Sequence, residues 1–342
     1  MEPVREMKPT MRVLISGAAG QIGYSIIPMI ASGKALGNNQ PIELVLLDIP
    51  PCEKKLRGVC MEIQDCSFPL VEKIIPTTDG KTAFQDVELC VLVGGFPRKK
   101  GMLRADLLKK NGSIFSDMGK AIAKTANKNV KVVVVANPAN TNCLITALNA
   151  ENIPKKNFSA LTRLDYNRAK GQLHERFKLT SPNHIKNVII WGNHSKTMFP
   201  DVIDAKVLRN GKWEAVSSVL SEEDKKWLEN DFITTVQQRG SSVIKARGLS
   251  SAMSAANAAV DHIHNLFLGT KEGHHVAMAV WSDGNPYGIE DGIFYSFPVK
   301  CKNGEWQFVD GIKNNTSRGK ELMKITEQEL LEEKRIALGS TE

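Results

Sequence analysis

The chain has 342 residues, 42% hydrophobic and 24% charged, which is an ordinary globular composition with enough length for two domains. Its 45 basic and 37 acidic residues give a net charge of +8 and a pI near 9.1, but the basic residues are spread along the chain, which favours solvated surfaces and predicts no nucleic-acid partner. The six cysteines have irregular spacing, which argues against a disulfide framework and a metal site. No window approaches the ~18 uninterrupted apolar residues of a membrane span.

Segments typical of strands and helices alternate through the first half of the chain. Four apolar runs predict buried strands, and the stretches between them have helical patterns. In chain order the segments are a strand at 11–17, a helix at about 21–33, a strand at 42–48, a helix at 53–66, a strand at 87–95, a helix that ends near residue 127 and a strand at 130–138. Buried strands separated by helices predict a doubly wound parallel sheet of the Rossmann kind, an α/β fold.

The second half of the chain has a different pattern, which predicts a mixed α+β region. Its segments are a helix at about 163–177, a strand at 187–195, a hairpin around 210–216, helices at about 221–239 and 242–268, strands at about 276–282 and 293–309, and a charged helix from about 318. The change in pattern predicts two domains, one over 1–155 and one over 156–342.

A glycine-rich turn follows the first predicted strand. Its sequence, GAAGQIG, places Gly17, Gly20 and Gly23 in the pattern G-x-x-G-x-x-G, a variant of the dinucleotide-binding fingerprint. Glycine lets the backbone turn tightly and approach a pyrophosphate, while the following helix directs its first N–H groups at that negative charge. Glycines also serve ordinary turns, but the position between a strand and a helix favours a dinucleotide site.

Asp48 ends the second predicted strand, where a carboxylate can accept hydrogen bonds from both ribose hydroxyls of a dinucleotide. Because its charge would repel a 2′-phosphate, NAD is favoured over NADP. Its separation from the glycine-rich turn exceeds the usual ~20 residues, which a long connection at 33–41 would explain. Two alternatives stay open: Asp48 could cap the next helix, and the nearby Lys54, Lys55 and Arg57 do not exclude NADP.

A basic loop, GGFPRKKGMLRADLL at 94–108, follows the third predicted strand. Its basic residues are Arg98, Lys99, Lys100 and Arg104, which could form a solvated surface, a contact with nucleic acid or a clamp for a small anion. The planar guanidinium of arginine is suited to bidentate binding of carboxylates. From these residues alone the three interpretations stay open.

His194 has the most suggestive position among the seven histidines, in WGNHS just after an apolar strand. A histidine is suited to accept a hydroxyl proton near neutral pH, and it needs a carboxylate to fix its tautomer and stabilise its charged form. Asp165 and Arg168, in LTRLDYNRAKG, stand at i and i+3 and so share one helix face. They can supply that carboxylate and a guanidinium for a substrate carboxylate, although a solvent-facing ion pair would have the same sequence.

Together these motifs resemble the cytosolic-type malate dehydrogenases of the lactate/malate dehydrogenase superfamily. The matching blocks run in the family's order from about residue 11 to about residue 336: GAAGQIG, LLDIP, GGFPRKKGMLRADLL, NPANTNC, LTRLDYNRAK, WGNHSKTMFPDV and LSSAMSAANA. The resemblance implies an NAD-binding Rossmann domain, a catalytic domain, a homodimer and reversible hydride transfer between (S)-malate and NAD⁺. It also implies a cytoplasmic location, consistent with an N-terminal sequence, MEPVREMKPT, that is unlike a signal or transit peptide.

The resemblance also implies a role for each matching residue. His194 resembles the catalytic proton acceptor and donor, and Asp165 resembles its carboxylate partner. Arg168 resembles the residue that binds the carboxylate beside the reacting carbon. Arg104 resembles the arginine that polarises the reacting carbonyl. Arg98 occupies the position that selects among substrates, which is an arginine in malate enzymes. On this basis we interpret Arg98 and Arg104 as an anion clamp and the lysines between them as solvated residues. The other implied contacts are Asn137 and Ser251 for the substrate, and Gly17, Gly20, Gln21, Ile22, Gly23, Asp48, Gly94, Asn111, Val135 and Asn137 for the cofactor.

One residue departs from the family pattern, and two other functions stay open. Met118 stands where the family often has a glutamine near the cofactor, which puts one hydrogen bond in doubt. A related 2-hydroxy acid dehydrogenase, specific for lactate-like or aromatic substrates, is one alternative, against which Arg98 argues. The other is a non-catalytic protein that binds NAD or nucleic acid, and the joint presence of the catalytic and substrate residues argues against it.

Overall fold

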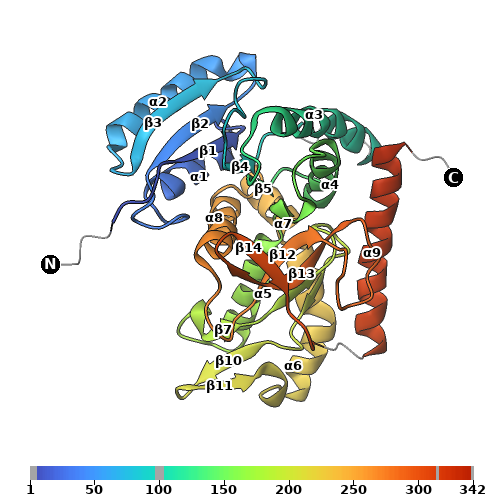
Figure 1. Cartoon of the computed structure of the whole chain (residues 1–342). Helices are drawn as coiled ribbons and strands as arrows, with labels where there is room; N and C mark the ends of the chain where they lie inside the picture. The colour runs from blue at the N-terminus through green and yellow to red at the C-terminus, as the bar shows by residue number, and fades with distance from the viewer. Residues whose placement is uncertain (1–5, 97–103, 313–315, 340–342) are drawn as a thin grey trace.

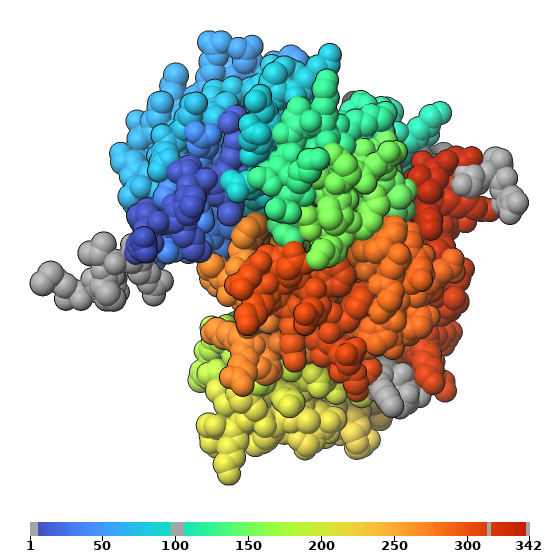
Figure 2. Space-filling view, in the orientation of Figure 1, coloured from blue at the N-terminus to red at the C-terminus, as the bar shows by residue number. Residues whose placement is uncertain are grey.

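The computed structural model describes residues 6–96, 104–312 and 316–339 (Figure 1). Its helices and strands are β1 (Met11–Ser16), α1 (Gln21–Ala31), β2 (Ile42–Leu47), α2 (Glu53–Cys66), β3 (Val71–Thr77), β4 (Leu89–Leu92), α3 (Arg104–Thr125), β5 (Lys131–Val134), α4 (Ala139–Asn149), β6 (Phe158–Ala160), α5 (Arg163–Arg176), β7 (Ile185–Lys186), β8 (Ile189–Trp191), β9 (Phe199–Asp201), β10 (Lys206–Arg209), β11 (Lys212–Ala215), α6 (Glu222–Trp227), α7 (Ile233–Arg247), α8 (Met253–Leu268), β12 (Val276–Trp281), β13 (Phe294–Lys302), β14 (Glu305–Phe308) and α9 (Ser317–Leu338). In Figure 2 the blue and green first half forms one end of the molecule and the yellow segment the other.

Six parallel strands form the first part of the main sheet, in the spatial order β3-β2-β1-β4-β5-β6. This is the doubly wound order of Rossmann folds, in which the chain returns to the centre of the sheet after three strands. Every residue of β4 and β5 is buried, as the continuous apolar runs predict. The predicted α/β class is therefore confirmed.

The second half of the chain extends the same sheet. Strands β12, β13 and β14 add to it in antiparallel fashion, and β12 joins through the pairing of Ala279 with Ala160 of β6. Two small sheets, β11-β10-β7 and β8-β9, complete this region. The predicted mixed α+β character is confirmed, with the addition that one nine-stranded sheet connects both halves of the chain.

The helices predicted at about 221–239 and 242–268 are divided differently in the structure. Helix α6 continues through a π-helical segment, Leu228–Phe232, into α7, which passes Gly240 without a break. The break comes instead at Gly248, whose φ of 72° is left-handed and ends α7. The prediction was wrong because glycine inside a helix costs only about 1 kcal/mol and does not by itself end it.

Strand β8 is also shorter than the predicted 187–195, because the chain turns at Gly192, which has a φ of 88°. Helix α4 is absent from the predicted set for a different reason. Residues 139–147 are all buried, so the sequence shows no alternation between a polar and an apolar face. A uniformly buried helix of this kind has no periodic signal to detect.

Helix α9 connects the two halves of the molecule. It packs against α3 and α4 of the first half and against β9 and β13 of the second, and it runs along one side of the molecule in Figure 1. No helix in the described ranges is long and apolar enough to cross a membrane.

His262 of α8 is a core histidine whose ionisation is coupled to folding. It is fully buried, and its Nε2 lies 2.9 Å from Ser159 Oγ of β6. Burial lowers its pKa from 6.5 to about 3, so the folded chain holds neutral imidazole. The unfolded chain binds a proton there below about pH 6.5. The resulting stabilisation is complete above that pH and declines as the pH falls toward 3.

We expect His262→Gln to flatten the acid side of the stability profile. Between pH 6.5 and 4 the free energy of unfolding of the wild type should fall by about 1 kcal/mol per pH unit more than that of the variant, measured by urea unfolding at each pH. His264→Gln, at an exposed position of the same helix, should keep the wild-type slope. The same slope in all three proteins would contradict the role assigned to His262.

Candidate active site

The carboxyl ends of β1, β4 and β5 meet at one edge of the sheet, where α/β folds bind ligands. Gly17 follows β1, and its φ of 66° is left-handed. A Cβ atom on Gly17 would lie 2.7 Å from Gly94 Cα, after β4, so the two backbones are in contact. Ser16 Oγ fixes this approach by accepting hydrogen bonds at 3.1 Å from the N–H groups of Val93 and Gly94. Val135 follows β5 and is largely buried.

The turn between β1 and α1 is a backbone cradle. A Cβ atom on Gly23 would lie 2.3 Å from Gly17 O, so only glycine allows the helix to begin this close to the turn. Gly20 is the N-cap of α1 and provides no side-chain cap. The first N–H groups of α1, near the exposed Gln21 and the half-buried Ile22, are therefore available to an anion. These features fit a dinucleotide pyrophosphate.

Asp48 links the end of β2 to this cradle. Its Oδ2 accepts a hydrogen bond at 2.9 Å from Ala19 N, and its Oδ1 accepts one at 2.8 Å from Ile49 N. Neither bond caps α2, whose N-cap is Cys52 with no side-chain cap. The carboxylate is half-buried and can still accept from ribose hydroxyls. Desolvation, followed by the charge of Asp48, raises the pKa of the Cys52 thiol, which favours its neutral form.

Asn111 of α3 holds two loops together at this edge. Its Oδ1 accepts a hydrogen bond at 2.7 Å from Phe96 N, and its Nδ2 donates at 3.3 Å to both Phe96 O and Asn137 O. Asn111 is fully buried, whereas Asn137 is exposed on the same side. Both Nδ2 hydrogens are thus used within the protein. A direct cofactor contact by Asn111 stays a prediction. In the structure its side chain links the backbones of Phe96 and Asn137.

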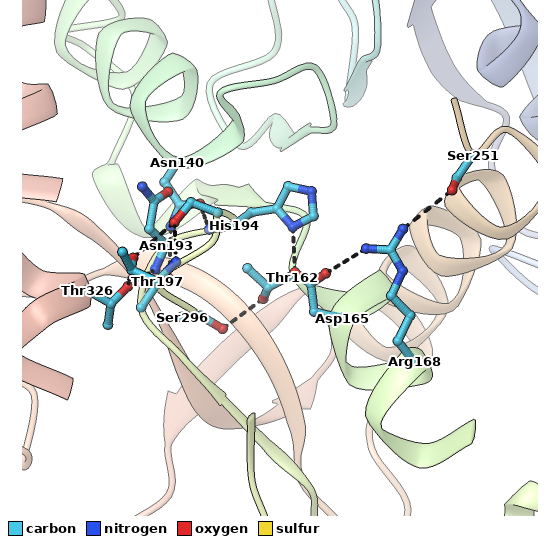
Figure 3. Close-up of polar contacts among 12 residues, drawn as sticks. Asn140, Thr162, Asp165, Arg168, Asn193, His194, Thr197, Ser251, Ser296 and Thr326 are labelled. Atoms are coloured by element: carbon cyan, nitrogen blue, oxygen red, sulfur yellow. Dashed lines mark hydrogen bonds and ion pairs between the residues drawn. The ribbon is translucent and has the colours of Figure 1, made fainter. Parts of the chain in front are cut away.

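The residues predicted for catalysis come together at the start of α5 (Figure 3). His194 Nδ1 lies 2.5 Å from Asp165 Oδ2, and Asp165 Oδ1 accepts a hydrogen bond at 3.2 Å from Arg168 Nη1. Arg168 Nη2 in turn lies 3.4 Å from Ser251 Oγ, just before α8. The Asp165 side chain is fully buried, while those of His194 and Arg168 are 17% and 11% exposed.

This arrangement has clear chemical consequences. A buried carboxylate that accepts from a histidine fixes the tautomer and the orientation of the ring. Asp165 therefore prepares His194 to accept a proton at Nε2. The Arg168 guanidinium, which is partly exposed, pairs with this buried carboxylate and can also bind a second, external carboxylate.

The sequence interpretation missed two residues that hold the backbone at Asn193 and His194. Asn140 of α4 accepts a hydrogen bond at 3.0 Å from His194 N through its Oδ1, and it donates from Nδ2 to Gly192 O at 3.2 Å. Thr326 of α9 accepts at 2.9 Å from Asn193 N. Asn140 was detectable only as the second asparagine of NPAN, and Thr326 carries no local signal at all.

The basic loop at 94–108 lies only partly within the described residues. Arg98 lies outside the described residues, and Arg104 is the first residue of α3, so the anion clamp stays a prediction from the sequence. Met118 is half-buried against the hydrophobic core beneath α3. Within the described residues no cluster of His, Cys, Asp and Glu could hold a metal ion.

Comparisons with known proteins identify the family. Residues 11–159 match the lactate/malate dehydrogenase NAD binding domain, and residues 162–339 match the lactate/malate dehydrogenase alpha/beta C-terminal domain. The cytoplasmic malate dehydrogenases of Gallus gallus and Homo sapiens are 54% and 53% identical to this chain, over 97% of it and 98% of each relative.

Solved structures agree with these matches. A malate dehydrogenase from Naegleria fowleri has a TM-score of 0.91 and 42% identity, covering 98% of this chain and 99% of its own. A Trichomonas vaginalis lactate dehydrogenase in complex with NADH and oxamate has a TM-score of 0.90 and 38% identity, covering 96% and 98%. The chain therefore belongs to the lactate/malate dehydrogenase family, with an NAD-binding domain of the Rossmann type.

Proposed function

We propose that this protein is an NAD-dependent malate dehydrogenase, which interconverts (S)-malate and oxaloacetate. The observation that carries the proposal is the buried carboxylate of Asp165 between His194 and Arg168, because it joins a proton acceptor to a carboxylate-binding guanidinium. Relatives with 54% and 53% identity over nearly the whole chain are named malate dehydrogenase, which supports this substrate.

His194 handles the hydroxyl proton in the proposed reaction. Since Nδ1 of His194 is hydrogen-bonded to Asp165, Nε2 is the nitrogen that can face the substrate. During malate oxidation, neutral His194 accepts the hydroxyl proton at Nε2, and the Asp165 carboxylate stabilises the imidazolium that forms. During oxaloacetate reduction, the same nitrogen returns the proton to the carbonyl oxygen.

The arginines bind and orient the dicarboxylate. Arg168 binds the carboxylate beside the reacting carbon, where its partly exposed guanidinium keeps free hydrogen-bond donors. From the sequence, Arg98 pairs with the far carboxylate, and Arg104 stabilises charge on the carbonyl oxygen. Ser251 and Asn137 complete the substrate contacts.

NAD, when bound, supplies or accepts the hydride. Gly17, Gly20 and Gly23 would hold its pyrophosphate against the first N–H groups of α1, and Asp48 would accept from its ribose hydroxyls. The other cofactor contacts in this proposal are Gln21, Ile22, Gly94, Asn111, Val135 and Asn137.

A panel of 2-oxo acids with NADH and NADPH tests the proposal. We expect kcat/KM for oxaloacetate with NADH to exceed that for pyruvate by roughly 100-fold, because pyruvate leaves one desolvated arginine unpaired. The assay follows the loss of NADH absorbance. A preference for pyruvate would instead favour a lactate dehydrogenase, the activity named for the similar Trichomonas vaginalis structure. If no 2-oxo acid were turned over, the result would favour a non-catalytic binding protein.

We further propose that the protein is a cytoplasmic homodimer with an NAD-binding unit over 1–155 and a catalytic unit over 156–342. The relatives named cytoplasmic support the location, and the family domains at 11–159 and 162–339 support the division. The homodimer rests on the resemblance of the sequence motifs to their family, and light scattering after size-exclusion chromatography tests it.

A further inference from the structure

His194 lies in the turn at residues 192–198, which joins β8 to β9. Gly192 begins this turn and pairs with Ser296 of β13 through hydrogen bonds of 3.2 and 2.9 Å. Asn140 of α4 then binds both Gly192 O and His194 N. The body of the sheet and α4 therefore hold one side of the turn, and the other side faces α9.

Thr326 of α9 is buried against the side of the turn that faces this helix. Its side chain is fully buried, and its Oγ1 accepts at 2.9 Å from Asn193 N and lies 3.0 Å from Thr197 Oγ1. A Cβ atom on Gly192 would lie 2.0 Å from Thr326 Cγ2, so the helix contacts the backbone of the turn directly. Figure 3 shows Thr326 close to Asn193 and Thr197, while the His194 ring extends away from them toward Asp165.

Glu329, one turn further along α9, binds the side chains of the same turn. Its Oε2 accepts from Asn193 Nδ2 at 2.9 Å, from Thr197 Oγ1 at 2.6 Å and from Ser195 Oγ. Glu333, a further turn along, accepts from Asn193 Nδ2 at 2.9 Å and from Thr141 Oγ1 of α4. The carboxylates of α9 thus bind three of the turn's side chains and one residue of α4.

These contacts follow a pattern along the turn. Asn193, Ser195 and Thr197 all point to α9, whereas His194 between them points to the opposite side and reaches Asp165. Anchoring the residues on both sides of His194 fixes the direction of its Cα–Cβ bond. A shift of about 1 Å in a catalytic group can cost about 100-fold in rate, so this anchoring bears on catalysis.

We propose that Thr326 and Glu329 are positioning residues that hold His194 in the geometry required for proton transfer. The inference rests on the proposed malate dehydrogenase function and goes beyond it, because both residues contact the neighbours of His194. Thr326 fixes the backbone of the turn through Asn193 N. Glu329 fixes the side chains on either side of His194. The contribution of α9 is therefore to the chemical step and not to substrate or cofactor binding.

A pair of variants at one position separates the hydroxyl from packing. Thr326→Val keeps the shape and removes the acceptor of Asn193 N, which leaves a buried N–H group without its partner. Thr326→Ser keeps the acceptor and removes the methyl group. We expect Thr326→Val to lower kcat about 10- to 100-fold and Thr326→Ser to remain within about threefold of the wild type, with similar KM for oxaloacetate and similar Kd for NADH in both.

A second pair tests the carboxylate. Glu329→Gln keeps the size of the side chain and weakens a site that accepts three donors, so we expect kcat to fall about 10-fold. Glu332→Gln is the matched control, because Glu332 is exposed on the same helix and pairs with Arg335. Its kcat should equal that of the wild type.

Two readouts distinguish positioning from general destabilisation. If proton transfer and the coupled hydride transfer become slower, the kinetic isotope effect on kcat with deuterated NADH should increase in Thr326→Val and Glu329→Gln. A merely structural role would lower Tm but leave both the isotope effect and kcat per folded molecule unchanged, which would overturn the inference. Failure of the wild type to reduce oxaloacetate would overturn the proposed function instead.

Discussion

Replacing Asp165 with asparagine is expected to lower kcat for oxaloacetate reduction by about 100- to 10,000-fold, the usual contribution of general acid–base catalysis. The Asp165 carboxylate is fully buried and lies 2.5 Å from His194 Nδ1. Asparagine can still accept the Nδ1–H hydrogen bond through Oδ1, but it brings no negative charge to stabilise the imidazolium. The defect should therefore appear in the chemical step, measured by steady-state kinetics.

The binding of NADH to Asp165→Asn, followed by fluorescence titration, should match the wild type because the cradle around Gly17 is not altered. Asp261→Asn is the matched control. Asp261 is half-buried on α8 and accepts hydrogen bonds from Asn167 of α5 at 3.2 Å and from Asn257 at 3.0 Å, without contact to His194. Its kcat should stay within about threefold of the wild type. Equal losses in both variants would mean that Asp165 acts only through the stability of α5.

Most of the fold could be predicted because its signals are local. The apolar runs of β1, β2, β4 and β5 predict buried strands, and their alternation with helices predicts a parallel sheet. The joining of β12 to β6 was beyond prediction, because the pairing of Ala279 with Ala160 depends on residues far apart in the chain. Helix α4 was missed because it is buried on all sides and therefore has no periodic pattern.

The candidate site also contains residues that the sequence predicts and residues that it does not. His194, Asp165 and Arg168 stand in short motifs whose chemistry is visible in the sequence, and the structure brings them together. Thr326 and Glu329 contact the His194 turn from α9, more than a hundred residues further along the chain, and their residue types alone suggest nothing. Residues that touch a substrate must have a particular chemistry, whereas residues that position them need only a hydrogen bond in the right place.

Replacing Arg98 with glutamine is expected to lower kcat/KM for oxaloacetate by at least about 30-fold. Truncating one partner of a desolvated charge pair costs roughly 2–5 kcal/mol, or about 30- to several-thousand-fold. Oxaloacetate has a second carboxylate that Arg98 can pair with, whereas pyruvate has none, so kcat/KM for pyruvate should fall much less. The ratio of the two values in variant and wild type is the deciding measurement.

The adjacent lysine provides a matched control for this experiment. Arg98 and Lys99 are neighbours in the same basic loop and both lie outside the described residues, so the sequence alone distinguishes them. We interpret Lys99 as solvated, and Lys99→Gln should change kcat/KM for oxaloacetate by less than about threefold, since exposed charges contribute little. If Arg98→Gln lowered kcat/KM equally for oxaloacetate and pyruvate, Arg98 would not select the dicarboxylate, and the choice of substrate would have to come from another residue of the site.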